Sequence, residues 1–204
     1  MHGEERPIAL EKGEMAAPRG EGVKAHALTA YQPYNRGVME PLVVDAFRYN
    51  KWANLHLLDV CANLPEEQLQ LTAPGTYGTI AATLLHLFAA EQRYLRRLAG
   101  TKPEINERET MPSVAVLRQH ATRSGDQLIE AAARITPDDT IDEERDGHPI
   151  RLYLWVVLTQ SMHHGNDHRT HVCTILGTHG IPYGDMDVWA YGQATGGIVH
   201  MGAS

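Results

Sequence analysis

The amino-acid sequence predicts an all-α protein, a four-helix bundle with a short hairpin or extended loop before its last helix. Four stretches carry apolar residues at helical spacing, and residues that favour helix starts and ends flank them. The sequence shows no convincing series of strands. A composition of 43% hydrophobic and 21% charged residues over 204 positions is typical of one folded domain. These observations favour a bundle, a fold that often builds metal sites between facing helices.

The first two helices have clear boundary signals. The first begins near Pro41, because proline suits the first helical turn, and it ends before Pro65. The second follows Thr79, whose side chain can cap a helix N-terminus, and it continues to Gly100, a typical residue at a helix end. We therefore expect two long helices in the first half of the periodic region.

The third helix follows Ser113 and breaks at Pro137, and Gly125 inside it is expected to cost about 1 kcal/mol relative to alanine. The dipeptide Asp146-Gly147 then predicts a tight turn between two short segments that can pair. The fourth helix is expected over residues 152–176, with Gly177 ending it.

The chain is predicted to contain three regions. Residues 1–38 mix prolines and glycines with polar residues and show no periodicity, so we expect a weakly structured extension. Residues 39–192 form the predicted metal-binding bundle, and residues 193–204 form a C-terminal tail.

Charge and cysteine content narrow the class of protein. A net charge of -7 without a basic cluster makes nucleic acid an unexpected partner. Cys61 and Cys173 lack CxxC spacing, so we predict neither a disulfide framework nor a thiolate zinc site, and a reducing cytoplasm fits best. The chain has no signal-peptide core and no apolar stretch near the roughly 18 residues that span a bilayer, so membrane association is not expected.

Histidines are concentrated toward the end of the chain. Five of the 12 lie in one stretch, namely His163, His164, His168, His171 and His179. His164 and His168 stand four residues apart, so their imidazoles share one helix face and can bind a single metal ion. Gly165, next to His164, has no side chain and is expected to leave room beside the two imidazoles. The sequence therefore predicts a metal site on the fourth helix.

A third ligand has to come from another helix, and His86 in the second helix is the best candidate. It lies nearly opposite the main apolar stripe of that helix, on a second face of small residues. A helix with two such faces is expected to pack against other parts of the protein on both sides. Three imidazoles would leave one coordination position open, as in reactive rather than structural metal sites.

Several neighbouring residues have more than one interpretation. His171 follows His168 by three residues and could replace one of the pair or act as a catalytic base. Glu91 in the second helix is either a catalytic group or a buried structural carboxylate paired with Arg169 or Arg93. We predict no binding residues for an organic cofactor.

The other histidines are expected to lie outside the site. His163 and its neighbour Asp167 point away from the chosen stripe, as surface groups or as supports for a ligand. Four more histidines have no partner at ligand spacing and are expected to be structural or solvated: His120, His148, His179 and His200.

Three segments carry a resemblance to a known family: YNKWAN, TLLHLFAAEQRYLRRL, and the long segment from MHHGNDHRTH to DMDVWAYG. They resemble the DinB/YfiT-like family of four-helix metalloproteins, and the resemblance extends from residue 41 to about residue 192. Family members carry a His-x-x-x-His-Arg pair in the last helix and one histidine in the second. The resemblance implies metal ligation by His86, His164 and His168, and it favours His164 over His171. The family continues with Gly-Gln after this arginine, whereas here Thr170 and His171 follow.

The resemblance also guides the functional prediction. It implies a divalent metal, with zinc and nickel expected first, a low-molecular-weight thiol among the small-molecule substrates, and a homodimer. The leading hypothesis is an enzyme with thiol S-transferase or hydrolase chemistry at an open metal position. The alternatives are a non-catalytic, metal-stabilised bundle that binds a small molecule or dimerises, and a helical dimerisation module whose histidines are only hydrogen-bonded.

Overall fold

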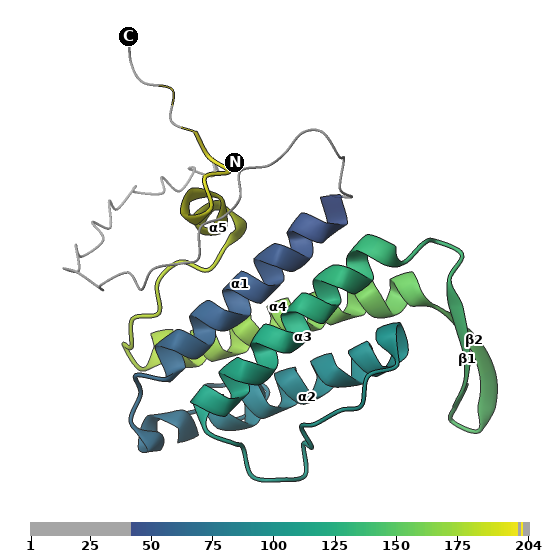
Figure 1. The fold of residues 1–204 in the computed structure, drawn as a ribbon. Helices are drawn as coiled ribbons and strands as arrows, with labels where there is room; N and C mark the ends of the chain where they lie inside the picture. The colour runs from purple at the N-terminus through teal and green to yellow at the C-terminus, as the bar shows by residue number, and fades with distance from the viewer. Residues whose placement is uncertain (1–41, 200, 202–204) are drawn as a thin grey trace, which may run out of the picture. The chain divides into compact units, whose positions relative to one another are not determined.

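A computed structural model describes residues 42–199 and 201, so the predicted extension over residues 1–38 lies outside the described residues. The described chain is mostly helical, with one two-stranded antiparallel sheet (Figure 1). The elements in order are α1 (Leu42–Cys61), the 3-10 helix η1 (Glu66–Gln70), α2 (Ile80–Ala99), α3 (Val114–Arg134), β1 (Thr140–Arg145), β2 (His148–Tyr153), α4 (Leu154–Thr178) and α5 (Val188–Ala194).

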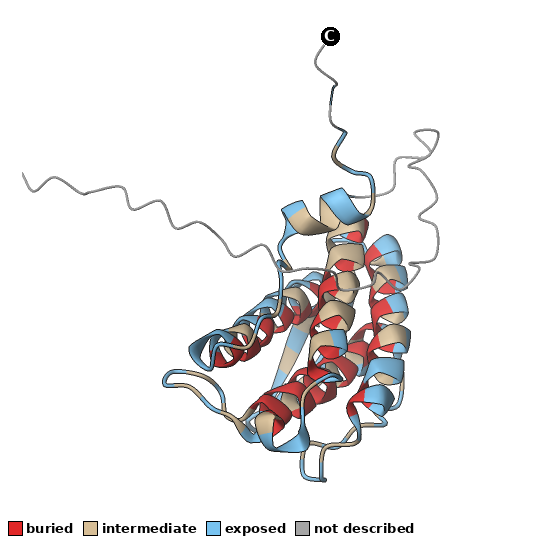
Figure 2. Ribbon diagram, turned by 90° about the vertical axis from the view of Figure 1, so that its left-hand side faces the viewer, coloured by how far each residue is buried: buried red, intermediate tan, exposed pale blue. Residues whose placement is uncertain are grey.

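The four long helices pack against one another, with α1 along α3 and α2 along α4 (Figure 1). Buried residues lie on the faces of these helices that meet the other helices, and exposed residues lie on the outer faces (Figure 2). Most of α2 is buried, on both the apolar stripe and the small-residue face, as the sequence predicts. None of the helices in the described part of the chain combines the length and the apolar character needed to cross a membrane.

The predicted helix ends of α2 and α3 are confirmed by their caps. The Thr79 side chain accepts a hydrogen bond from the backbone of α2, and Gly100 ends that helix at φ 69°. Ser113 caps α3 in the same way. In the hairpin turn, Asp146 and Gly147 both have positive φ, at 52° and 77°, as a tight turn of this kind requires.

The fourth helix begins and ends two residues later than the sequence predicts. Leu152 belongs to β2, where it pairs with Ile141, so α4 begins only at Leu154. At the other end Gly177 stays helical, and the chain turns at Gly180, which has φ 69°. Strand pairing and a later left-handed glycine therefore set these ends.

Gly125 has a packing role that offsets its low helix propensity. A Cβ atom at this position would lie 2.6 Å from Cγ of Lys51, so only glycine admits the Lys51 stem between α1 and α3. The Lys51 ammonium then reaches Asp126 at 2.5 Å.

A buried polar layer divides the core into two apolar clusters. One cluster contains the C-terminal part of α1 and the N-terminal halves of α2 and α3, and the other contains the opposite ends of these helices. Between them lie buried polar side chains from all four long helices: Asn50 and Asn54 of α1, Glu91 of α2, Ser124 of α3 and Arg169 of α4. The layer therefore occupies the same level on each helix.

Hydrogen bonds connect this layer. Nη1 of Arg169 donates to Oδ1 of Asn50 at 2.6 Å and to Oδ1 of Asn54 at 2.7 Å. The Asn54 amide donates to Glu91 at 3.1 Å, and the Ser124 hydroxyl donates to the other oxygen of the same carboxylate. Burial raises the pKa of Glu91 to about 7, although Ser124, the Arg169 charge and Asn54 oppose the shift.

The raised pKa of Glu91 predicts a specific pH dependence of stability. Between the ordinary value of 4.5 and about 7, the folded protein holds a proton that the unfolded chain releases, so the free energy of unfolding falls as pH rises. Glu91→Gln removes this contribution. We expect urea unfolding in the presence of a chelator to show the native protein losing stability relative to Glu91→Gln between pH 5 and pH 8.

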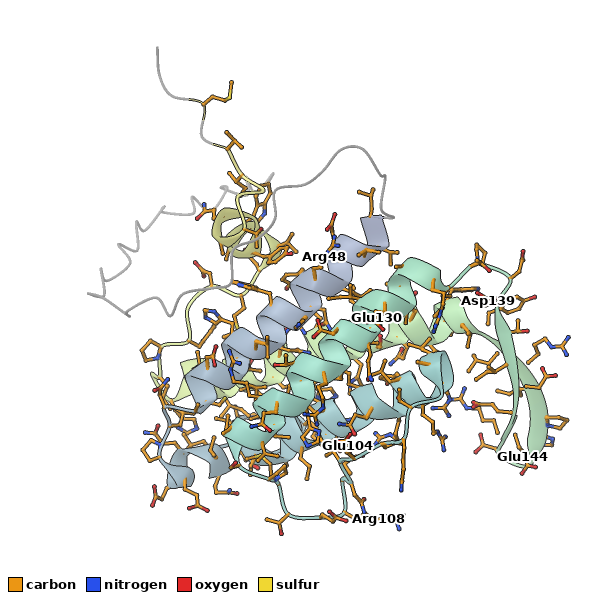
Figure 3. All side chains as sticks on the ribbon, viewed as in Figure 1. Arg48, Glu104, Arg108, Glu130, Asp139 and Glu144 are labelled. Carbon is orange, nitrogen blue, oxygen red and sulfur yellow. The ribbon has the colours of Figure 1, made fainter. Side chains whose placement is uncertain are left out.

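Glu130→Gln is the matched control, because Glu130 is an exposed glutamate of α3 (labelled in Figure 3). This variant should follow the native protein at every pH. Parallel stability curves for the native protein and Glu91→Gln would contradict the raised pKa.

Candidate metal centre

Three histidines from two helices meet at one point. His86 comes from α2, and His164 and His168 come from α4, one helical turn apart. Their ring centroids are 5.0 Å apart for His86 and His164, 4.7 Å for His86 and His168, and 4.3 Å for His164 and His168. One nitrogen from each ring lies within 4.8 Å of the others, so the group could hold a metal ion.

The nitrogens of His86 and His164 face each other directly. Their Nε2 atoms are 3.1 Å apart. Two imidazole nitrogens at this distance share either a proton or a metal ion, because two lone pairs alone repel. The donor set therefore fits a divalent cation that prefers imidazole.

Glu107 fixes the orientation of His86. Glu107 belongs to the loop between α2 and α3, on which Figure 3 labels Glu104 and Arg108, and one oxygen of its carboxylate is bonded to Nδ1 of His86. The other oxygen accepts a hydrogen bond from Arg93 at 2.6 Å. Partial burial acts against ionisation, yet the bonds from His86 and Arg93 hold the pKa of Glu107 below its ordinary value. A carboxylate on Nδ1 leaves Nε2 as the nitrogen for a metal, an arrangement common to metal-binding histidines.

Two tyrosines enclose the group of histidines. The Tyr77 ring stacks on His86 with centroids 4.2 Å apart, and it meets His168 edge-on at 5.1 Å. Its hydroxyl donates to Glu107 at 3.3 Å. Tyr94 meets His164 edge-on at 5.6 Å. Tyr77 is 50% exposed, so it lies where the site opens to solvent.

The surroundings keep the two α4 histidines neutral. Burial, together with the neighbouring imidazoles, lowers the pKa of both His164 and His168 from 6.5 to about 4. Neutral imidazole is the form that binds metal.

The other predicted site residues are not members of this group of three histidines. His171 approaches His168 from outside the group, with the two Nδ1 atoms 3.4 Å apart. Because that contact involves Nδ1 of His168, its Nε2 is the nitrogen that remains available to a metal. Glu91 belongs to the buried polar layer, and its hydrogen bonds come from Asn54 and Ser124 rather than directly from an arginine. His163 pairs with Asp167 at 3.3 Å on the exposed side of α4.

Gly165 leaves room beside the histidines, as expected, and side chains of the polar layer occupy that room. A Cβ atom there would lie 2.8 Å from Oδ1 of Asn50 and 3.1 Å from Nη1 of Arg169. The glycine therefore makes room for the buried polar layer and not for a metal. Of the remaining histidines, His120 lies 3.2 Å from Glu104, and His179 bonds the backbone oxygen of Thr72. His148 lies in β2, and His200 is outside the described residues.

Sequence reasoning did not find Tyr77 or Glu107. Tyr77 lies in a turn and Glu107 in a loop, so neither carries a periodic signal that would place it beside the histidines. Tyr94 lies eight positions after His86, which is about 80° further round α2, so helical spacing alone does not place it on the face of His86.

A family model for the DinB family matches residues 39–199, most of the chain. The chain belongs to the DinB family. A solved structure of a DinB-like protein from Bacillus cereus has the same fold, with a TM-score of 0.53 and 19% sequence identity over 70% of this chain and 94% of that one. A comparison with curated proteins finds no match.

The bond between Glu107 and His86 predicts how metal affinity responds to substitution. Glu107→Gln keeps the size of the side chain but removes the charge that orients and polarises His86. We expect zinc affinity, measured by competition with a chromogenic chelator, to fall about 10- to 100-fold. Glu109→Gln, an exposed glutamate of the same loop that accepts from Asn106, should bind zinc as the native protein does. Equal affinities for all three proteins would show that Glu107 has no part in binding.

Proposed function

We propose that this DinB family protein is a divalent-metal-dependent enzyme of the DinB/YfiT bundle type, with His86, His164 and His168 as the metal ligands. The observation that carries the proposal is the 3.1 Å separation of two Nε2 atoms, one of them on a ring whose other nitrogen is bonded to a carboxylate. This tautomer directs the free nitrogen of His86 toward the nitrogens of α4. Zinc and nickel both suit three imidazoles.

Three protein ligands leave a position at which water or a thiol can bind. A metal held there would lower the pKa of bound water toward 7 or deprotonate a bound thiol, which would permit hydrolysis or S-transfer. The chain contributes the orientation of the three imidazoles, and Tyr77 forms an exposed wall beside them. Arg93 forms an ion pair with Glu107 and so holds in place the carboxylate that orients His86.

The cysteines of the chain favour a thiol supplied by the substrate. Burial, together with the nearby Cys173, raises the pKa of Cys61 to about 12, and burial raises that of Cys173 to about 11. Neither is a thiolate at neutral pH, so neither is a nucleophile for the reaction. We therefore favour thiol S-transfer from a low-molecular-weight thiol, with hydrolysis as the second reaction class. We place this chemistry in the cytoplasm, in a homodimer that binds neither nucleic acid nor membranes.

The proposal predicts that metal and turnover are lost together. In His164→Ala we expect metal content, measured by mass spectrometry of the purified protein, to fall from about one ion per chain to near zero. Consumption of an electrophile in the presence of a small thiol should fall with it. His163→Ala is the control, because its side chain is adjacent but exposed and pairs with Asp167; it should retain both properties.

The outcomes separate the alternatives. Metal binding with ester or amide hydrolysis alone would identify a hydrolase. Metal binding without turnover, together with a lower melting temperature after chelation, would identify a non-catalytic, metal-stabilised protein. Equal metal content in His164→Ala and the native protein would overturn the site.

A further inference from the structure

A large groove lies on the other side of α4 from the histidine group. It has a volume of about 800 Å³ and is lined by α1, by α4 and by the end of α3 with the residues that follow it. Its walls are mainly apolar and include Val43, Phe47, Trp155, Leu158 and Met162. Cavities of this size are typical of sites for small organic ligands.

The groove and the histidine group use different faces of one helix. Successive residues of an α-helix are rotated by about 100°, so Met162 and Asn166 lie roughly opposite His164 on α4. Met162 and Asn166 line the groove, whereas His164 faces His86 of α2. The groove is therefore separate from the proposed metal centre.

Arg169 forms part of the groove wall and has an unsatisfied donor. The residue is only 4% exposed, and its Nη1 bonds both asparagines of the polar layer. Its Nη2 is buried and has no hydrogen-bond partner among the described residues. A buried donor without an acceptor costs free energy of folding. The most favourable partner of a guanidinium is a carboxylate.

The charge of the lining has one sign. Arg169 is the cation of the wall, and His163 and Asn166 add groups that can donate hydrogen bonds. No aspartate or glutamate is among the described residues that line the groove. An anionic group is therefore complementary to the polar end, and an apolar chain is complementary to the rest.

We propose that this groove binds an amphipathic carboxylate, with its apolar chain between α1 and α4 and its carboxylate at Arg169. Trp155 and Phe47 supply the apolar surface for the chain. The positive charge of Arg169 and the polar side chains of His163 and Asn166 favour the carboxylate at that end of the groove. This function is independent of the proposed chemistry at the histidines.

Three probes with the same ten-carbon chain test the proposal: decanoate, decanol and decyltrimethylammonium. In calorimetric titrations of the full chain below the micelle concentrations, decanoate should bind at least 10-fold more tightly than decanol, and the cation should bind most weakly. Equal binding of all three would overturn the proposal, because a surfactant-like apolar contact alone would explain it.

Thr159→Trp locates the binding site. Thr159 is exposed and lines the groove, so a tryptophan there fills the space without entering the core, and decanoate affinity should fall at least 10-fold. Gln160→Trp, at the next exposed position and outside the lining, should bind decanoate as the native protein does. Metal content measured on the same samples should stay unchanged in both variants, so a failure of the groove and a failure of the metal centre are distinguishable.

Arg169→Gln tests the head-group contact. This variant should lose the preference for decanoate over decanol while keeping its affinity for decanol. If it does not fold, the probe series and Thr159→Trp still decide the matter. Absence of decanoate binding, with a dimer in sedimentation that Thr159→Trp dissociates, would overturn the proposal in favour of a second copy of the chain in the groove.

Discussion

The hydrogen-bonded layer around Arg169 and Glu91 is the constraint on which the arrangement of the helices depends. Apolar contacts tolerate sliding, whereas a buried charge and a buried carboxylate require partners at fixed positions. Asn54 contacts both of them, so α1 links α4 to α2, and Ser124 adds α3. The layer lies between two apolar clusters, and its few directional hydrogen bonds fix how the four helices are positioned along one another. The layer requires glycine at position 165, because a side chain there would collide with Asn50.

The same register brings the histidines together. Arg169 is adjacent to His168 on α4, and Glu91 lies five residues after His86 on α2. The contacts that position Arg169 and Glu91 therefore also position the histidines of α4 relative to His86. The loop carrying Glu107 then orients His86 from outside the packed helices. On its opposite side, α4 forms the apolar groove with α1, and Arg169 reaches both the layer and the groove wall. One helix therefore supplies the proposed metal ligands and a second candidate binding surface.

Local sequence signals predicted much of the helical structure. Thr79, Ser113 and Gly100 mark helix ends through bonds within a few residues, and Asp146-Gly147 marks the turn by its backbone preference. The spacing of His164 and His168 is also local, and the two-faced character of α2 identified His86 as their companion. Contacts from turns, loops and other helices were not predictable in this way. Tyr77, Glu107 and the partner of Gly165 are set by tertiary packing, and no periodicity records them.

The ligand set of the metal-loaded protein tests the central claim most directly. X-ray absorption at the metal edge should show three histidine nitrogens at about 2.0 to 2.1 Å if zinc is bound, with the remaining ligand exchangeable. His171→Ala should leave that spectrum unchanged, because His171 contacts His168 and not the other ligands. Fewer than three nitrogens, a sulfur ligand, or a loss of one nitrogen in His171→Ala would contradict the account.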